Sequence, residues 1–208
     1  MTVTIQVLAG DEVLAAIEDL AALRMAVFAR WPYLYDGDPA YEAEYLREFV
    51  AAPGAVLVAA CDGARIVGAA TASPMAAQKA AFQAPFAARG LDVSRLFYFG
   101  ESVLLPEYRG QGIGHAFFDQ REAQALRLGA EAACFAAVIR PDTHPDRPVD
   151  YVPLDGFWGR RGYGPVAGFV TEFAWKDHRD AGETAKPMQY WLRRFSPATP
   201  RPDAGPPR

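Results

Sequence analysis

Hydrophobic and polar positions change their period several times along the chain. Short apolar runs, alternating or continuous, predict strands at 2–8, 55–61, 65–73, 95–105, 132–139, 167–175 and 188–195. Apolar residues at helical spacing predict helices over 13–29, 39–50, 111–128 and 150–161. Helices and strands therefore interleave, and hairpins occur as well. The predicted fold class is α/β with a central mixed sheet rather than a fully parallel one.

Local signals place the ends of several elements. Asp11 and Asp38 can each cap the helix that follows, because their side chains accept hydrogen bonds from the first free backbone N–H groups. Asp62-Gly63 predicts a tight hairpin between two strands. In the helix over 111–128, Arg121 falls within the apolar side, and the hydrophobic pattern does not explain it.

The length of 208 residues suits one domain, which we place over 1–195. The Ala-rich segment 74–94 predicts an irregular helical excursion interrupted by Pro85. Two aromatic residues in it, Phe82 and Phe86, are either a lid over a site or the side chains that pack the segment down.

Composition fits a soluble globular protein, with 51% hydrophobic and 22% charged residues. A net charge of −4 argues against a nucleic-acid partner. The N-terminus lacks a charged stretch followed by a long apolar core, so we expect no signal peptide, no membrane span and a cytoplasmic protein. Cys61 and Cys134 lie in apolar runs and are interpreted as buried. The Pro-rich segment 196–208 is expected to be a flexible tail.

A glycine-rich turn joins the strand over 95–105 to the helix over 111–128, with glycines at 110, 112 and 114. The first turn of a helix has free N–H groups and a partial positive charge, so this turn can cradle an anion. The spacing is neither that of a dinucleotide-binding turn nor that of a phosphate-binding Walker loop. On the glycines alone, a tight structural turn is the alternative.

The context of this turn carries a family resemblance. The stretch from Val103 to Gly114 closely resembles the acetyl-CoA-binding motif of the GCN5-related N-acetyltransferases (GNAT), with Arg109, Gly112 and Gly114 at its defined positions. The resemblance implies that backbone N–H groups hold the CoA diphosphate, and that the preceding strand pairs with pantetheine as an added strand would. The implied CoA-binding residues are Val103, Leu104, Leu105, Arg109, Gly110, Gln111, Gly112, Ile113 and Gly114.

The predicted order of elements is similar to that of the same family over about 2–195, and the segment 157–163 is similar to the end of one of the family's helices. The segment 74–94 is longer than the usual connection and looks like a subfamily insertion. The resemblance implies transfer of an acetyl group from acetyl-CoA to a primary amine. Homodimers are common among such enzymes, so the resemblance is compatible with one here.

Acetyl transfer needs a base, because an alkylammonium with a pKa of about 10 has no lone pair near neutral pH. The family often uses a glutamate on the strand before the glycine turn, and Glu101 lies there, two residues before Val103. It shares the alternation of Phe97, Phe99 and Val103, which predicts a largely apolar setting that suits a base. The alternative is a structural carboxylate paired with an arginine.

The leaving thiolate needs a proton, and the family often supplies it from a tyrosine. Trp158 stands at the matching position, which departs from the family's pattern, and Tyr163 matches a core aromatic residue. Tyr151, slightly upstream, is the substitute that we consider. It is either the catalytic acid or a loop aromatic that packs on the domain, and water is a further proton source.

The segment between the first two helices lines the acceptor pocket in the family that the chain resembles. The implied acceptor contacts are Trp31, Tyr33, Tyr35 and Asp36. Aromatic faces and carboxylates, including Asp38 and Glu101, suit an ammonium group through cation–π contacts and charge. The alternative is that Trp31 and Tyr33 are core residues and that Asp36 belongs to a turn.

Three functions stay open on the sequence. The favoured one acetylates a small-molecule amine, since the aromatic cluster and the insertion suit a closed pocket. The second acetylates a protein N-terminus or lysine, and the third is a non-catalytic acyl-CoA-binding regulatory module. No metal is expected, because His115, His144 and His178 lack ligand spacing.

Overall fold

A mixed sheet organises residues 3–195, which are the residues that the computed structural model describes. Within them the seven strands follow the order β1-β2-β3-β4-β5-β7-β6. The strands are β1 (Val3–Leu8), β2 (Val56–Asp62), β3 (Arg65–Pro74), β4 (Leu96–Leu104), β5 (Ala132–Val138), β6 (Gly164–Trp175) and β7 (Thr184–Arg194). Only β4 and β5 pair in parallel, so the predicted mixed sheet is confirmed. The tail predicted over 196–208 lies outside the described residues.

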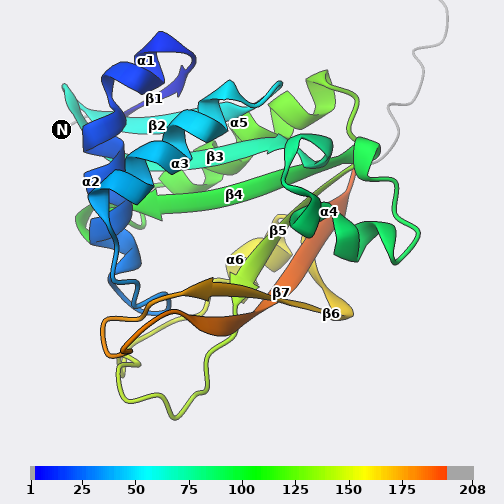
Figure 1. Ribbon diagram of the computed structural model, residues 1–208. Helices are drawn as coiled ribbons and strands as arrows, with labels where there is room; N and C mark the ends of the chain where they lie inside the picture. Colours follow the sequence, from blue (N-terminus) through cyan, green and yellow to red (C-terminus); the bar gives the residue numbers. More distant parts are fainter. Residues whose placement is uncertain (1–2, 196–208) are drawn as a thin grey trace, which may run out of the picture.

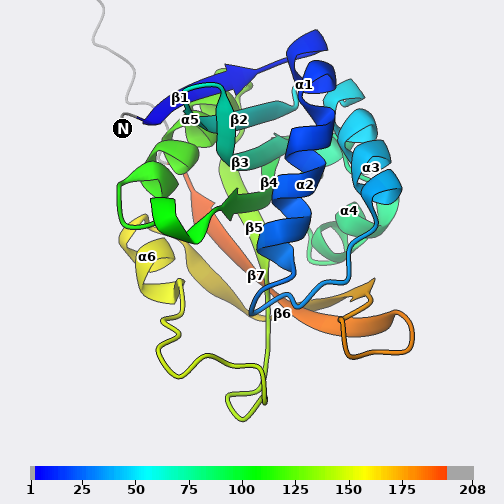
Figure 2. The ribbon, with the colours of Figure 1, turned by 90° about the vertical axis from the view of Figure 1, so that its left-hand side faces the viewer.

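Helices cover both faces of this sheet. They are α1 (Asp11–Ala15), α2 (Ile17–Phe28), α3 (Pro39–Ala51), α4 (Ala80–Ala87), α5 (Ile113–Arg127) and α6 (Asp155–Arg160). Seen along the strands, α2, α3 and α4 lie on one side and α5 and α6 on the other (Figure 2). Among the described residues, no helix combines the length and the apolar composition that crossing a membrane requires.

Two helix predictions were wrong in their extent. The single helix predicted over 13–29 is broken at Ala16, whose φ of −100° and ψ of 9° leave the helical range, although Val13 and Ile17 stay in one core cluster. The helix predicted over 150–161 begins only at Asp155. Pro153 disfavours a helical conformation of the residue before it, which explains the late start.

The predicted turn and one of the two predicted caps are confirmed, whereas the Asp11 cap was wrong. Asp11 is the first residue of α1 rather than the residue before it, and its side chain makes no capping hydrogen bond. Asp38 accepts a hydrogen bond from the Tyr41 N–H at 2.8 Å and caps α3. Gly63, with a φ of 60°, lies in the turn between β2 and β3. Cys61 and Cys134 are both buried and free, as their apolar contexts predicted.

The insertion packs onto the sheet. Pro85 lies inside α4 rather than ending it, because two residues of the helix follow it, although its missing N–H removes one hydrogen bond of the helix. Phe86 is fully buried, and its ring lies 4.7 Å from those of Phe169 and Tyr190. Of the two interpretations of this segment, packing is therefore the one that holds for Phe86. Phe82 packs in the same cluster, with its ring 4.9 Å from that of Phe173.

The sheet divides between β4 and β5. Their register runs only from Leu96 opposite Ala132 to Tyr98 opposite Cys134. Beyond this point β4 stays with β3, while β5 turns away with β7 and β6 (Figure 1). The second half of β4 thus has one edge that no strand of the described chain covers. The functional residues gather around that edge.

Candidate active site

A β-bulge shapes the middle of β4. Ala70 of β3 lies opposite Ser102 and Ala72 lies opposite Phe99, so Thr71 alone faces two residues, Gly100 and Glu101. The Glu101 N–H donates to the Thr71 Oγ1 at 3.2 Å. A Cβ atom on Gly100 would lie 2.6 Å from that oxygen, so the bulge needs glycine at this position.

The bulge overturns one prediction about Glu101. An extra residue reverses the faces of the strand, because side chains alternate with a period of two. Phe97 and Phe99 pack in the cluster beneath α5, whereas Val103 packs in the cluster beneath α2 and α3. The predicted shared alternation was therefore wrong for Phe97 and Phe99, and the carboxylate of Glu101 meets α2 on the side of Val103.

The setting of Glu101 is charged rather than apolar, which corrects the second part of that prediction. Arg24 of α2 forms ion pairs with Glu101 Oε1 and with Glu42, whose side chain is 1% exposed. The Tyr45 hydroxyl donates to Glu101 Oε2 at 3.0 Å. Burial alone would lower the pKa of Arg24, but Glu101, Tyr45 and Glu42 together raise it above its ordinary value. The arginine-paired carboxylate, which was the alternative interpretation of Glu101, is thus present, on the part of β4 that lies beyond its pairing with β5.

Arg121, which the hydrophobic pattern left unexplained, lies under the same bulge. It is 1% exposed, and its guanidinium lies 4.3 Å from the ring centroid of Phe99. Its Nε donates to Phe117 O at 3.2 Å, and its Nη1 donates to Thr71 O at 3.4 Å and to Glu101 O at 3.2 Å. Burial lowers the pKa of Arg121 to about 10, so the side chain keeps its charge at neutral pH.

The glycine-rich turn leads directly from the end of β4 into α5. Gly110 and Gly112 have φ angles of 76° and 81°, which favour glycine. A Cβ atom at either position would meet nothing within 4 Å, so the space above the turn is open. The third glycine differs, because a Cβ at Gly114 would lie 3.5 Å from the ring of Phe157 on α6. Two glycines therefore shape an open cradle, and the third packs against α6 at ordinary contact distance.

The open edge of β4 continues from this cradle. The Leu105 N–H donates to Val67 O on β3 at 3.0 Å. Backbone groups of alternate residues point to opposite edges of a strand, so Ser102 and Leu104 present theirs to the edge that β5 leaves uncovered. Leu104 was among the predicted CoA-binding residues but Ser102 was not, because no pattern in the sequence indicates a bulge.

A buried arginine joins three segments on the opposite side of the opening. Arg140, just after β5, donates to both carboxylate oxygens of Asp177 at 2.8 and 2.9 Å. The same guanidinium donates to Pro32 O at 2.9 Å and to Tyr33 O at 2.8 Å. It thereby ties the α2–α3 loop to the turn between β6 and β7.

A cavity of about 590 Å³ lies between that loop and that turn. Of the four predicted acceptor contacts, Tyr33, Tyr35 and Asp36 line it, together with Arg24 and Glu42. Asp36 also pairs with Lys176 at 2.6 Å. Arg24 connects the cavity to Glu101, because it contacts the carboxylates on both sides.

Trp31 is not among the residues that line this cavity. Its ring packs 5.0 Å from His144 and 5.9 Å from Tyr151, in the long loop after β5. Burial raises the pKa of the Tyr151 hydroxyl, Asp155 raises it further, and Arg147 and Arg109 act in the opposite direction. Tyr151 thus lies within electrostatic reach of Arg109 in the glycine-rich turn.

Trp158, at the position of the family's tyrosine, is partly buried and packs against the core. The Trp158 ring lies 5.0 Å from those of Phe135 and Trp191. Tyr163 is 2% exposed, and its hydroxyl donates to Glu122 Oε1 at 3.1 Å. The core position predicted for Tyr163 is confirmed, and neither ring presents a free hydroxyl group to the opening.

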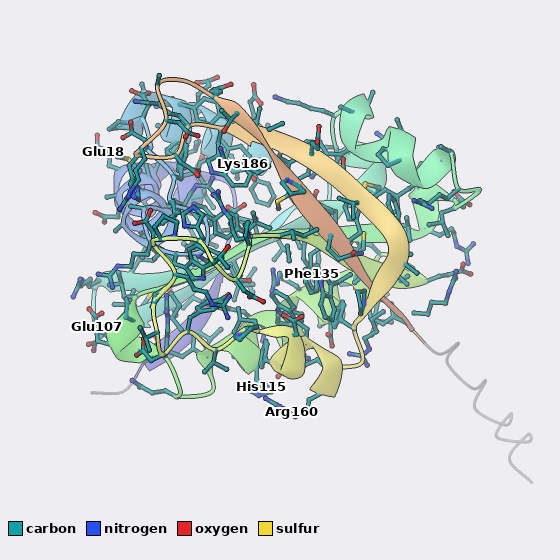
Figure 3. The ribbon with its side chains drawn as sticks, turned by 90° about the horizontal axis from the view of Figure 1, so that it is seen from below. Glu18, Glu107, His115, Phe135, Arg160 and Lys186 are labelled. Atoms are coloured by element: carbon teal, nitrogen blue, oxygen red, sulfur yellow. The ribbon has the colours of Figure 1, made fainter. Side chains whose placement is uncertain are left out.

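Ion pairs fasten the cradle helix to α6. Arg161 pairs with Asp119 at 2.7 Å and with Glu122 at 2.9 Å, which joins the end of α6 to α5. In Figure 3 the labelled His115 and Arg160 mark these neighbouring helices, with Phe135 in the interior. Within residues 3–195, no group of three or more His, Cys, Asp or Glu side chains is placed to hold a metal ion.

Comparison with known proteins agrees with this geometry. A model of the acetyltransferase (GNAT) family matches residues 20–148. No curated protein matches the chain. An aminoglycoside 6′-N-acetyltransferase complexed with coenzyme A has a similar structure, with a TM-score of 0.59, 18% identity and coverage of 96% of this chain and 99% of that one.

Two further solved structures share the fold. A ribosomal-protein-alanine N-acetyltransferase from Brucella melitensis has a TM-score of 0.61 at 11% identity, covering 92% of this chain and 99% of that one. A GNAT-family acetyltransferase from Streptococcus pneumoniae has a TM-score of 0.58 at 9% identity, covering 93% and 100%. The family model spans more than half of the 208 residues. The chain therefore belongs to the acetyltransferase (GNAT) family, whose acyl donor is acetyl-CoA.

Proposed function

We propose that this acetyltransferase moves the acetyl group of acetyl-CoA to a primary amine of a small molecule. One observation carries the proposal. Glu101 lies in the part of β4 that β5 leaves unpaired, and Arg24 contacts both its carboxylate and Glu42 in the lining of a cavity of about 590 Å³. A donor on the open edge of β4 and an amine from that cavity would meet beside Glu101.

The donor side uses backbone groups. The N–H groups over 111–114, at the positive end of α5, suit the diphosphate of acetyl-CoA, and the open space above Gly110 and Gly112 admits it. Pantetheine would then run along β4 as an added strand would. Of the predicted residues Val103, Leu104 and Leu105, only Leu104 turns its backbone groups to the open edge, and Ser102 joins it.

Glu101 is the base in this proposal. Its carboxylate takes the proton of the ammonium, directly or through a water molecule, and the freed nitrogen attacks the thioester carbonyl carbon. Arg24 and Tyr45 hold the carboxylate in one orientation, which favours productive geometry over side-chain freedom. The nitrogen of the tetrahedral intermediate loses its second proton to solvent, and collapse of the intermediate then forms the amide and breaks the C–S bond.

Tyr151 is the proposed donor of a proton to the leaving thiolate. Its raised pKa keeps the hydroxyl protonated at neutral pH, and Arg109 lies within electrostatic reach. The tyrosine then recovers its proton from solvent. Two observations support this assignment: Trp158 has no titratable hydroxyl group, and the Tyr163 hydroxyl is buried and donates to Glu122.

A small acceptor fits the way in which the cavity is built. Its walls are the α2–α3 loop and the β6–β7 turn, and Arg140 ties the two together through Asp177, Pro32 and Tyr33. Fixed walls suit a compact ligand better than a protein chain. The family fold alone does not distinguish a small-molecule acceptor from a protein acceptor. The similar structures include both an aminoglycoside acetyltransferase and a ribosomal-protein acetyltransferase.

The experiment is thiol release from acetyl-CoA against a library of small amines, amino acids and N-terminal peptides. We expect turnover with small amines, and a loss of roughly 10²-fold or more in kcat for Glu101→Gln. Glu44→Gln, on the exposed side of α3, is the matched control and should keep full activity. Turnover confined to peptides would exclude the small-molecule acceptor. Equal activity of the two variants would exclude Glu101 as the base.

A further inference from the structure

Arg121 is an unusual residue for the interior of an amphipathic helix. It is a buried cation that forms no ion pair with a carboxylate among residues 3–195, and its Nη2 has no hydrogen-bond partner there. Burying a guanidinium without a carboxylate is unfavourable, and a leucine or methionine would fill the same place on α5 at no such cost. Stability alone therefore does not account for an arginine at this position.

Its partners point to a local role. Thr71 O and Glu101 O lie on the two strands that form the bulge, where the regular ladder is interrupted. One guanidinium nitrogen from α5 donates to both carbonyl groups. The rings of Phe99 and Phe118 lie 4.3 and 4.7 Å from the guanidinium centre and keep it in place.

The Glu101 carbonyl shares a peptide unit with the Ser102 N–H. That unit is trans, since the cis bond of the described chain is Trp31–Pro32. In a trans unit the C=O and the N–H point in opposite directions. With its carbonyl turned to Arg121, the unit turns the Ser102 N–H away from α5 and β3, to the edge that β5 leaves open.

We propose that Arg121 is a positioning residue, which fixes the Glu101–Ser102 peptide unit so that the Ser102 N–H donates to a carbonyl oxygen of the bound acyl-CoA donor. This inference rests on the proposed function. The acceptor oxygen belongs either to the thioester or to a pantetheine amide. Coenzyme A carries only the amide carbonyls, whereas acetyl-CoA carries the thioester carbonyl as well. Comparing the two ligands therefore distinguishes the two sources of the oxygen.

The variants are Arg121→Met, which removes both hydrogen bonds, and Arg121→Lys, which keeps the charge and one point donor. Gln124→Met is the matched control. Gln124 is also buried on α5 and also donates to a backbone carbonyl, that of Gly54 at 3.1 Å, but Gly54 precedes β2 and is not part of the bulge. Thermal unfolding of each variant confirms that it folds, and Arg121→Lys keeps the test available should Arg121→Met fail to fold.

The first readout is the amide resonance of Ser102 in ¹⁵N-labelled protein, titrated with coenzyme A and with acetyl-CoA. In the wild type we expect a downfield shift of the Ser102 amide proton on binding. The shift should be unchanged in Gln124→Met and at least halved in Arg121→Met. A shift with acetyl-CoA alone assigns the contact to the thioester, and a shift with both assigns it to pantetheine. An equal shift in Arg121→Met and Gln124→Met would overturn the proposal.

The second readout separates kcat from KM with an amine that the library identifies. A misplaced donor contact should lower kcat roughly 10- to 10²-fold in Arg121→Met, while the KM for acetyl-CoA changes less than about threefold. A purely structural role would instead lower the melting temperature and leave kcat per folded molecule unchanged. If acetyl-CoA does not bind the wild type, the proposed function fails as well. If it binds and the variants behave alike, only the role of Arg121 fails.

Discussion

Arg24 and Arg121 hold Glu101 from opposite faces of the sheet. Arg24, on α2, pairs with the carboxylate, and Arg121, on α5, donates to the backbone carbonyl. The two helices lie on opposite sides of β4 (Figure 2). The side chain and the carbonyl group of Glu101 are thus held by two different residues. Substituting one arginine should therefore leave the contact of the other in place.

Removing Arg24 should destabilise the fold strongly. Arg24→Met leaves Glu42 and Glu101 with buried, unpaired carboxylates, which typically costs about 3–5 kcal/mol. Arg47→Met is the control, because its pair with Glu44 is exposed and is worth at most about 1 kcal/mol. Urea unfolding measures both. A similar loss for the two variants would contradict the buried network.

Gly112→Ala should weaken coenzyme A binding, whereas Gly129→Ala should not. The two glycines have φ angles of 81° and 75°, and a Cβ at either meets nothing within 4 Å. Each substitution therefore carries the same strain, roughly 1–2 kcal/mol. Gly112 begins α5 and Gly129 follows its end, so only the first borders the cradle. Calorimetric titration with coenzyme A decides, and equal affinities would place the diphosphate elsewhere.

The Arg140–Asp177 pair should support acceptor binding through the loop that it holds. Asp177→Asn keeps the shape but loses charge-assisted bonds, which we expect to cost about 1–3 kcal/mol and to raise the KM for the amine. Asp142→Asn removes an exposed pair with Arg147 in the same region and should change neither value. Steady-state kinetics and thermal unfolding test this. An unchanged KM for Asp177→Asn would show that the Arg140–Asp177 pair does not contribute to acceptor binding.

Phe86→Ala should lower stability and leave catalysis intact. The ring is fully buried between Phe169 and Tyr190, and truncation of such a ring costs about 3–5 kcal/mol. If the insertion instead acted as a moving lid, kcat or KM would change at temperatures where the variant is folded. Kinetics well below the melting temperature distinguish the two roles.

The buried hydroxyl of Tyr33 should make the free energy of unfolding decrease at alkaline pH. Burial, Glu101 and Tyr151 raise the pKa of Tyr33 to about 12, while a tyrosine in the unfolded chain titrates near 10. Its contribution is fully present below about pH 10 and is lost as the pH rises to about 12, because only the unfolded chain releases this proton in between. Urea unfolding from pH 9 to 12 should give a shallower decline for Tyr33→Phe. An identical decline would refute the assignment.

The motif and most elements could be predicted from the sequence, because local spacing determines them. The glycine-rich turn is such a case, since positive φ angles at Gly110 and Gly112 leave a mark in the sequence. The bulge left none, because it arises from the pairing of β4 with β3. Three features that depend on the bulge could therefore not be predicted either: the face on which Glu101 lies, the exposure of the Ser102 N–H and the reason for Arg121. Each depends on a partner distant in sequence, and periodicity along a single segment does not report such contacts.

The acceptor side was anticipated in part for the same reason. Tyr33, Tyr35 and Asp36 line the cavity, but its other wall comes from residues after β6. Trp31 does not line the cavity, because its ring packs against His144 and Tyr151 of the loop after β5. Loop-to-loop packing of this kind has no period from which it could be predicted.

The short seam between β4 and β5 has a consequence for how the enzyme could be divided. Three residue pairs join the two parts of the sheet, and the chain crosses between them near Gly129. The cradle and Glu101 belong to the part before this point, whereas Tyr151 and Arg140 belong to the part after it. Two fragments cut there would each carry half of the proposed chemistry, so acetyl transfer would report their reassembly, as in a complementation sensor.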